Sequence, residues 1–305
     1  MITHSDVANQ ARGWHGQGHH HHGPSRAMHS PPDLGPAQHA MIADLVHQTA
    51  QTEIMPRFRR LRPADIAQKS GPLDLVTEAD TAAETMLSAG LHRLFPGAAI
   101  LGEEAAQATP GLRDAAAKAP LAFIIDPVDG TWNFAHGLAM FGVIIAATRY
   151  GRPIFGLIHD PVAQDDVMAC ENSPARHISA DGQVRPLSVA QPKPLAAMQG
   201  YVHLSLMPKA RQHELAPRLT RFARTDALRC SAHEYRQAAQ GHIDFLASPQ
   251  LTPWDHAAGV LIYQQAGGVA RLLDGQDYHI GTTEGTLLCA PSQNCWQAVA
   301  QVLQP

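Results

Sequence analysis

The sequence predicts a mixed α/β protein built from two packed halves. Short apolar runs typical of strands, such as 121–125 and 153–159, alternate with amphipathic stretches typical of helices. The Pro-rich stretch 186–194 separates two such series and is too short to be a long linker. We therefore expect an N-terminal α+β half over residues 37–190 and a C-terminal α/β half over residues 191–305.

Composition and charge exclude several classes of protein. A net charge of -4 and a pI near 6.5 give no support for a protein that binds nucleic acid or a membrane surface. No apolar run approaches the length of a membrane span. The four cysteines form no CxxC pair and follow no secretory segment, so we expect free thiols and a cytoplasmic protein.

Residues 1–36 differ from the rest of the chain. They are rich in Gly, His, Pro and Ser, include the run His19 to His22, and have no periodic apolar face. Such a segment cannot offset its ordering entropy by burial, so we expect a disordered tail. The histidines could bind a transition metal, but a solvated tail without a catalytic role is the favoured interpretation.

The two halves contain predicted helices and strands in alternation. The first half has, in order, a helix over 37–61, extended chain over 66–76, a helix over 77–94, strands over 98–101, 121–125, 141–148 and 153–159, and further strands to Val189. The second has strands near 198–202, 227–229, 243–247 and 286–290, and helices over 209–222, 233–240, 254–265 and from Ser292.

A strand that ends in carboxylates is the central feature of the first half. The apolar run 121–125 stops at Asp126, and Pro127 should force a turn there. Asp126, the carbonyl of Val128 and Asp129 are hard oxygen ligands of the kind that magnesium prefers. Gly130-Thr131 should then begin a short helix, whose free amides would accept an anion. These residues predict a metal site beside a phosphate site.

Other acidic residues have both a structural and a functional interpretation. A second strand ends in Glu103 and Glu104, and two such strand ends favour a shared metal site. Thr77 and Asp80 form a capping box, which alone would explain both residues. Asp255 lies where a helix begins, and taken alone it is better explained as a helix cap than as a metal ligand.

Four segments in this order resemble the inositol monophosphatase family of magnesium-dependent phosphatases. They are Asp74-Leu-Val-Thr-Glu-Ala-Asp80, Gly102-Glu-Glu104, Asp126-Pro-Val-Asp-Gly-Thr131 with Asn133-Phe134, and Trp254-Asp-His-Ala-Ala-Gly259 followed by Ala266-Gly-Gly268. The resemblance implies a layered α-β-α-β-α sandwich, shared with fructose-1,6-bisphosphatases. It also implies a phosphoric monoester hydrolase that uses two to three Mg²⁺ ions and acts on a small phosphorylated metabolite. A homodimer is compatible with it, although no residue marks an interface.

The resemblance also implies roles for particular residues. Those that match the family's metal ligands are Glu103, Asp126, the carbonyl of Val128, Asp129 and Asp255. Asp80 and Thr131 match the pair that positions and deprotonates the attacking water, which the metals activate for in-line attack. Gly130 and Thr131 would bind the phosphate through their amides. Lys69 falls where the family often places a lysine near the metal, and Glu104 lies beside the ligands.

The sequence departs from the inositol-specific members around the leaving-group pocket. Ser248 stands where those members hold ring hydroxyls with a glutamate, and Gln265 replaces another common glutamate. Ser231 and His233, with Glu234 and Arg236, are candidate pocket residues, or else a surface helix end. A sugar phosphate, histidinol phosphate or nucleotide 3'-phosphate is therefore as admissible a substrate as inositol phosphate. The alternatives are a 3'(2'),5'-bisphosphate nucleotidase, or a regulatory or binding protein on the same fold.

Overall fold

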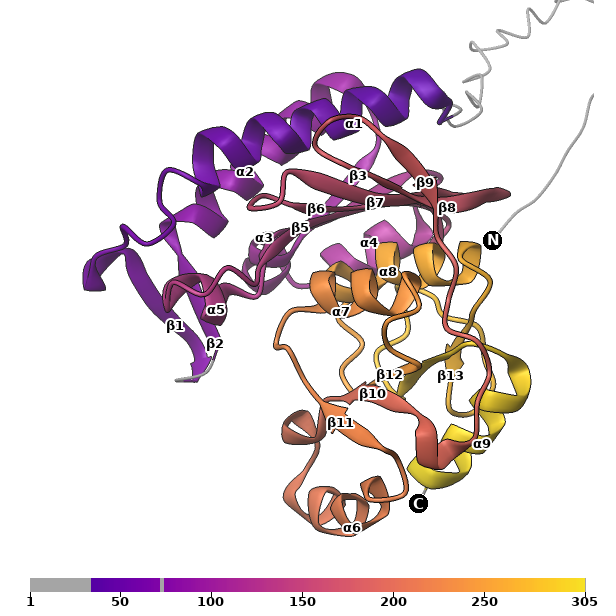
Figure 1. The fold of residues 1–305 in the computed structure, drawn as a ribbon. Helices are drawn as coiled ribbons and strands as arrows, with labels where there is room; N and C mark the ends of the chain where they lie inside the picture. The colour runs from indigo at the N-terminus through magenta and orange to yellow at the C-terminus, as the bar shows by residue number, and fades with distance from the viewer. Residues whose placement is uncertain (1–33, 72–73, 305) are drawn as a thin grey trace, which may run out of the picture. The chain divides into compact units, whose positions relative to one another are not determined.

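Two large β-sheets organise the part of the chain that the computed structural model describes, residues 34–71 and 74–304 (Figure 1). One has seven strands in the order β3-β4-β5-β6-β7-β8-β9, and the other has five in the order β11-β10-β12-β14-β13. All described residues belong to one unit, Pro32–Pro305. The predicted disordered tail falls mainly on residues 1–33, which lie outside the described residues, and helix α1 begins at Pro36.

The seven-stranded sheet is antiparallel except for the parallel pair β3–β4. Its strands are β3 Ala99–Gly102, β4 Ala122–Asp129, β5 Gly142–Arg149, β6 Arg152–Asp160, β7 Asp165–Cys170, β8 Ser173–Ile178 and β9 Val184–Pro186. The central strands β4, β5 and β6 are buried on both faces, which explains their continuous apolar sequences. Alternate residues of β4, such as Phe123 and Ile124, enter two different cores.

The five-stranded sheet is mixed, with β10 parallel to β11 and β12 and with β14 antiparallel to β12 and β13. Its strands are β10 Gln199–Val202, β11 Arg224–Asp226, β12 Phe245–Ser248, β13 Val269–Leu272 and β14 Leu287–Ala290. A separate hairpin pairs β1 Ile66–Gly71 with β2 Asp74–Thr77. Strand β13 has no counterpart in the prediction, and β11 lies three residues before its predicted position.

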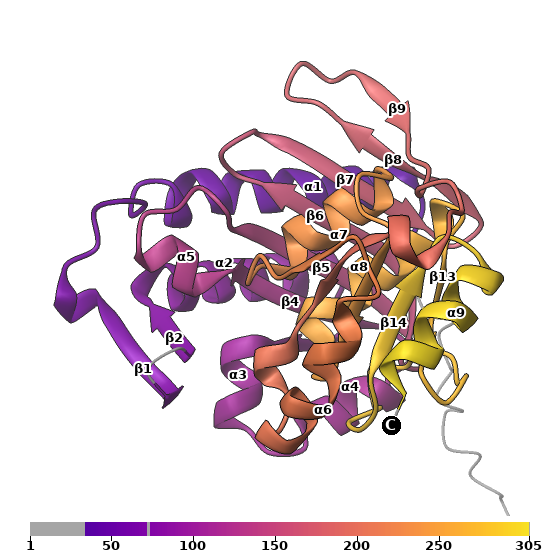
Figure 2. The same cartoon turned by 60° about the horizontal axis from the view of Figure 1, so that its bottom comes forward.

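Helices cover both sheets and separate them. They are α1 Pro36–Thr49, α2 Glu78–Leu94, α3 Glu103–Ala108, α4 Leu112–Lys118, α5 Thr131–Ala135, α6 Lys209–Leu219, α7 Ser231–Ala239, α8 Pro253–Gln265 and α9 Gln293–Leu303. Short helical turns occupy Ala50–Ile54, Pro63–Asp65, Leu195–Ala197 and Leu204–Leu206. Helices α1 and α2 pack on one face of the seven-stranded sheet, and α7 and α8 lie between the two sheets (Figures 1 and 2).

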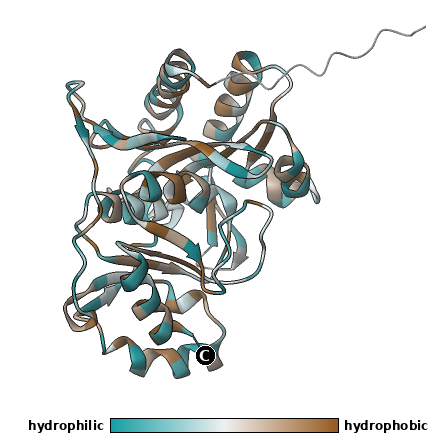
Figure 3. Cartoon of the chain, turned by 90° about the vertical axis from the view of Figure 1, so that its right-hand side faces the viewer, coloured by the Kyte–Doolittle hydropathy of each residue, from teal (hydrophilic) through white to brown (hydrophobic). Residues whose placement is uncertain are grey.

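The layers follow the order α-β-α-β-α, because α6 and α9 cover the outer face of the five-stranded sheet. Helices that pack on a sheet carry both apolar and polar residues, as the colours along the helices in Figure 3 show. The predicted α/β sandwich is therefore confirmed. None of the described helices is long and apolar enough to cross a lipid bilayer.

The predicted boundary near residue 190 coincides with the connection between the two sheets. Strands β3 to β9 before it form the seven-stranded sheet, and strands β10 to β14 after it form the five-stranded sheet. Helix α8 follows the boundary in sequence but packs against β5, β6 and β7 of the first sheet. The division into residues 37–190 and 191–305 stays a prediction.

Two predictions about local structure are wrong. The first helix ends in a π-helical turn at Ala50–Ile54 and does not reach residue 61. Strand β4 does not stop at Asp126 but continues through Pro127 to Asp129. Proline is tolerated because β3 pairs with β4 only as far as Ile125 and the pairing with β5 is irregular between Asp126 and Asp129.

Strand β6 and helix α8 approach closely at Gly156, which yields a first prediction. A Cβ atom at this position would lie 2.8 Å from the carbonyl oxygen of Ala258 and 2.9 Å from its Cα. We expect Gly156→Ala to destabilise the protein by about 1–3 kcal/mol, because helix backbone must move to relieve the clash. Urea denaturation measures the change. Gly71→Ala is the matched control, since no atom of the described residues outside its chain neighbours lies within 4 Å of its Cβ. Equal stability of the two variants would contradict this account.

Candidate active site

Three aspartates that are distant in sequence meet at the end of β4. Asp126 and Asp129 belong to this strand, and Asp255 lies in the first turn of α8. One carboxylate oxygen from each lies within 4.8 Å of the others. Asp126 and Asp129 are buried and Asp255 is half-buried. The packing of α8 against the first sheet therefore builds a cluster that neither half contains alone.

The carboxylates of this cluster repel one another when they are ionised and no cation neutralises them. Burial and the charges of Glu103, Asp129 and Asp255 raise the pKa of Asp126 well above its usual range. Burial and the charge of Asp255 raise the pKa of Asp129 to about 7. The buried Oδ1 of Asp126 has no hydrogen-bond partner among the residues that the structure describes. An unpartnered buried oxygen among crowded carboxylates fits a hard divalent cation, which would neutralise the charges and use the free lone pairs.

Glu103 begins α3 and is not one of the three residues that meet within 4.8 Å, but its charge acts on Asp126. Burial and the charge of Asp255 raise its pKa to about 8, against the opposing effect of Lys69. Its carboxylate accepts a hydrogen bond of 2.8 Å from the Nζ of Lys69, which also donates to Glu104 at 2.6 Å. Burial lowers the pKa of Lys69, but the charges and hydrogen bonds of the two glutamates outweigh this and raise it. Lys69 thus holds both glutamates near the cluster.

Glu84 is a residue of the site that sequence reasoning missed. Its carboxylate accepts hydrogen bonds of 2.8 Å from the backbone amides of Glu104 and Ala105 at the start of α3. A Cβ at Gly102 would meet the Glu84 carboxyl carbon at 2.2 Å, so only glycine allows this approach. Glu84 therefore fixes the helix start that carries Glu103. Its position on the buried face of α2 is the only signal, and any buried helical residue shares it.

The two carboxylate oxygens of Asp80 make different contacts: one takes part in the helix cap and the other contacts Thr131. Oδ2 accepts hydrogen bonds from the backbone amide and the hydroxyl of Thr77, at 2.8 and 2.6 Å, and so completes the capping box of α2. Oδ1 accepts the hydroxyl hydrogen bond of Thr131 at 2.9 Å. Burial raises the pKa of Asp80, and the hydrogen bonds from Thr77 and Thr131 oppose this rise. The helix cap thus positions the acceptor of Thr131.

Thr131 begins α5 directly after Gly130, whose φ of 85° lies in the left-handed region. A Cβ at Gly130 would lie 2.9 Å from the carbonyl oxygen of Met140. The binding of phosphate by the amides of Gly130 and Thr131 stays a prediction.

Residues of the second half of the chain hold Asp129 in place. Its Oδ2 accepts hydrogen bonds from the Cys230 thiol at 3.1 Å and from the Ala232 amide.

The candidate pocket residues have several structural partners. Glu234 is fully buried and accepts hydrogen bonds from His203 and from the Leu228 amide, and Arg236 is buried in an ion pair with Asp165. The interpretation of these two residues as a surface helix end is therefore wrong.

The other three candidates are Ser231, His233 and Ser248. Ser231 is buried at the start of α7, and the buried hydroxyl of Ser248 donates to the carbonyl of Gln250 at 3.1 Å. The Nε2 of His233 lies 3.1 Å from the carbonyl oxygen of Phe141. Whether these three contact a substrate stays a prediction.

Asp255 does not cap its helix, contrary to the interpretation favoured from the local sequence. The N-cap of α8 is Thr252, and Asp255 stands three positions later. The hydroxyl of Thr252 donates a hydrogen bond to Oδ2 of Asp255. This contact orients the carboxylate toward β4, where it joins Asp126 and Asp129.

A layered α/β fold with a carboxylate cluster between its two sheets could hold a divalent cation, as the sites of metal-dependent hydrolases do. The sequence model of the inositol monophosphatase family matches residues 38–304. This chain therefore belongs to the inositol monophosphatase family and is a phosphatase.

Individual relatives agree with this assignment. An inositol-1-monophosphatase of Bacillus subtilis is 30% identical over 230 residues, which cover 74% of this chain and 83% of the relative. A histidinol-phosphatase of Streptomyces coelicolor is also 30% identical, over 77% of this chain and 86% of the relative. The structure of a Thermotoga maritima IMPase superposes with a TM-score of 0.73 at 24% identity, over 88% of this chain and 96% of that one, and so shares the fold.

The raised carboxylate pKa values yield a prediction for the protein stripped of divalent cations. Asp129 and Glu103, with pKa values of about 7 and about 8 in the folded state, both have values of about 4 when unfolded. The folded state therefore binds more protons between these limits, and the free energy of unfolding should fall as pH rises from about 5 to about 8.5. Chemical denaturation in a chelator measures it.

The matched variant for this prediction is Asp129→Asn, which removes one of the titrating groups. Its stability should depend less steeply on pH over the same window. Added Mg²⁺ should stabilise the original chain more at the high-pH end, because the ligands there are already ionised. Equal pH slopes for the two proteins would show that Asp129 ionises normally.

Proposed function

We propose that this protein is a Mg²⁺-dependent phosphomonoesterase that hydrolyses a small phosphorylated metabolite. The observation that carries the proposal is the convergence of Asp126, Asp129 and Asp255 beside the hydrogen-bonded pair Thr131–Asp80. Two to three magnesium ions held by Glu103, Asp126, the Val128 carbonyl, Asp129 and Asp255 would supply charge neutralisation of the phosphoryl oxygens and of the leaving group. The oxygen-only set of these ligands supports magnesium over softer metals.

Thr131 and Asp80 would position and deprotonate the attacking water. The Oγ1 of Thr131 lies 2.9 Å from Oδ1 of Asp80, to which it can donate its hydrogen, and 3.0 Å from the carbonyl oxygen of Val128. The lone pairs of the hydroxyl oxygen are then free to accept a hydrogen from a water molecule. Asp80 is fixed in turn by two hydrogen bonds from Thr77, so the acceptor does not move when a proton is transferred.

Lys69 would stabilise the carboxylates of the proposed site. Its ammonium group lies between Glu103 and Glu104 and reduces the repulsion among the carboxylates. Because Lys69 comes from the β1–β2 hairpin and the glutamates come from α3, their ion pairs join two separate elements. Its positive charge would also attract a phosphate dianion toward the cluster.

The substrate class is best supported as an inositol phosphate, a sugar phosphate or histidinol phosphate. Relatives of nearly equal identity are named for inositol-1-phosphate and for histidinol phosphate hydrolysis. A phosphate-release screen across phosphorylated metabolites, with and without Mg²⁺, tests the proposal. Release from none of these monoesters in the presence of Mg²⁺ would contradict it.

Replacement of the buried ligand Asp126 gives the sharpest prediction. Asp126→Asn keeps the shape of the side chain but removes the charge, so we expect Mg²⁺-dependent turnover to fall about 10³-fold or more, equivalent to several kcal/mol of lost stabilisation. Steady-state phosphate release measures the loss, and circular dichroism checks the fold. Undiminished turnover would remove Asp126 from the mechanism.

Substitution of Thr131 separates the hydroxyl from the shape of its side chain. Thr131→Val should lower kcat by about 10²- to 10⁴-fold, because the group that accepts the proton is lost. Thr131→Ser keeps the hydroxyl and should retain most of the activity, which makes it the matched control. If the valine and serine variants lose the same activity, Thr131 acts through packing and not through its hydroxyl.

A further inference from the structure

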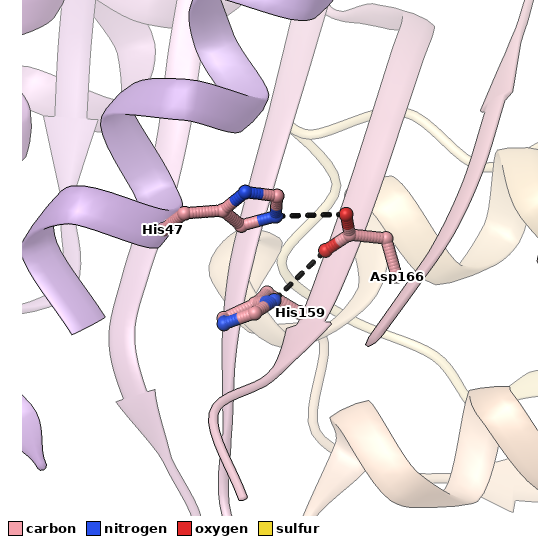
Figure 4. Close-up of side chains that lie close together, drawn as sticks. All are labelled: His47, His159 and Asp166. Carbon is pink, nitrogen blue, oxygen red and sulfur yellow. Dashed lines mark hydrogen bonds and ion pairs between the residues drawn. The ribbon is translucent and has the colours of Figure 1, made fainter. Parts of the chain in front are cut away.

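A second cluster of potential metal ligands lies on the face of the seven-stranded sheet that α1 covers. It consists of His47 from α1, His159 from β6 and Asp166 from β7 (Figure 4). One ligand atom from each lies within 4.8 Å of the others. Among the residues that the structure describes, this is one of two such clusters, and the phosphatase mechanism uses only the aspartate cluster.

The sheet fixes two of the three side chains. His159 and Asp166 are directly paired across β6 and β7, so they project side by side from the same face. Both are buried, with side-chain exposures of 5%. The neighbouring Asp165 projects to the opposite face, where it binds Arg236 and His177. The carboxylate of Asp166 therefore contacts the two histidines on the side of the sheet that α1 covers.

Helix α1 supplies the third side chain and the route for an ion. The Nε2 of His47 lies 2.8 Å from Oδ2 of Asp166, and the Nδ1 of His159 lies 2.8 Å from Oδ1 of the same carboxylate. Figure 4 shows both imidazoles directed at Asp166. The side chain of His47 is 38% exposed, so this side of the cluster is open to solvent. An ion could enter there and keep water in its remaining coordination positions.

We propose that His47, His159 and Asp166 form a second metal site, which takes a divalent transition metal of the zinc class. Two imidazoles and one carboxylate suit such a metal, whereas the oxygen-only aspartate cluster suits magnesium. Ligand atoms around a tetrahedral zinc ion are about 3.3 Å apart. This spacing lies between the present 2.8 Å contacts with Asp166 and the 4.8 Å within which all three ligand atoms lie, so small side-chain shifts would create the site.

The metal would take the place of the hydrogens that now join the three side chains, and each neutral imidazole would carry its one proton on the other ring nitrogen. Hydrogen bonds from His159 and His47, opposed by burial, lower the pKa of Asp166 to about 2, so its carboxylate is ionised and ready to bind a cation. The nearby charge of Asp44 adds to the negative potential at His47. A bound ion would tie α1 to β6 and β7, and α1 in turn packs against α2, the helix that carries Asp80.

The test measures the binding of Co²⁺ and Zn²⁺ to the full-length chain. His19 to His22 are first replaced by alanine, because this histidine run would bind the same metals. Excess Mg²⁺ is present throughout to fill the aspartate cluster. We expect one Co²⁺ per chain with the visible absorption of a nitrogen-ligated, low-coordinate ion, and displacement of Co²⁺ by Zn²⁺.

Two variants test the ligands and a third provides the control. His47→Ala and Asp166→Asn should weaken the binding of both metals at least tenfold. His92→Ala removes an exposed histidine from α2 and should leave binding unchanged. Zn²⁺ should raise the Tm of the His92 variant but not that of the His47 variant.

Two results would overturn the proposal. One is the absence of stoichiometric binding once His19 to His22 are replaced. The other is undiminished affinity in His47→Ala, a substitution at a partly exposed position that is compatible with folding, because the ion would then lie elsewhere. Magnesium-supported phosphatase activity should be the same in His47→Ala as in the original chain. Failure of this proposal therefore leaves the proposed phosphatase function untouched.

Discussion

Repulsion between buried carboxylates is the constraint on which the rest of this structure depends. Asp126 and Asp129 are buried and Glu103 is half-buried, and the pKa of each is raised by desolvation and by its neighbours. Such a group would separate if its side chains were free to move. Three hydrogen bonds hold the carboxylates in place. Lys69 donates to Glu103, the amide of Ala232 donates to Asp129, and the hydroxyl of Thr252 donates to Asp255. Each restraint comes from a different element, which explains why the site lies where so many of them meet.

Much of this arrangement is visible in the sequence, because some constraints are local. The capping box of Thr77 and Asp80 and the helix start after Gly130 depend on residues within a few positions of each other. Strands β4, β5 and β6 are recognisable because a strand that is buried on both faces is continuously apolar.

Features that depend on tertiary contacts are harder to predict from the sequence. Pro127 continues β4 because β3 has already ended, and no local signal reports the length of a neighbouring strand. Glu84 binds amides twenty residues away, so its role appears only once α2 and α3 are packed. For Asp255, local reasoning favours a helix cap, and only the family pattern indicates the metal site; the structure brings its carboxylate within 4.8 Å of Asp126 and Asp129. How these residues bind ions and substrate stays a prediction.

The position of α8 between the two sheets has a consequence for protein synthesis. A ribosome completes every strand of the first sheet, with Asp126 and Asp129, before it reaches the helix that carries Asp255. Until α8 emerges and docks, the nascent chain exposes the apolar sheet face that this helix covers and lacks the third aspartate of the cluster. The growing polypeptide should therefore complete the aspartate cluster late, in the same step that covers this sheet face, and chaperones that recognise apolar surface have a defined interval in which to act.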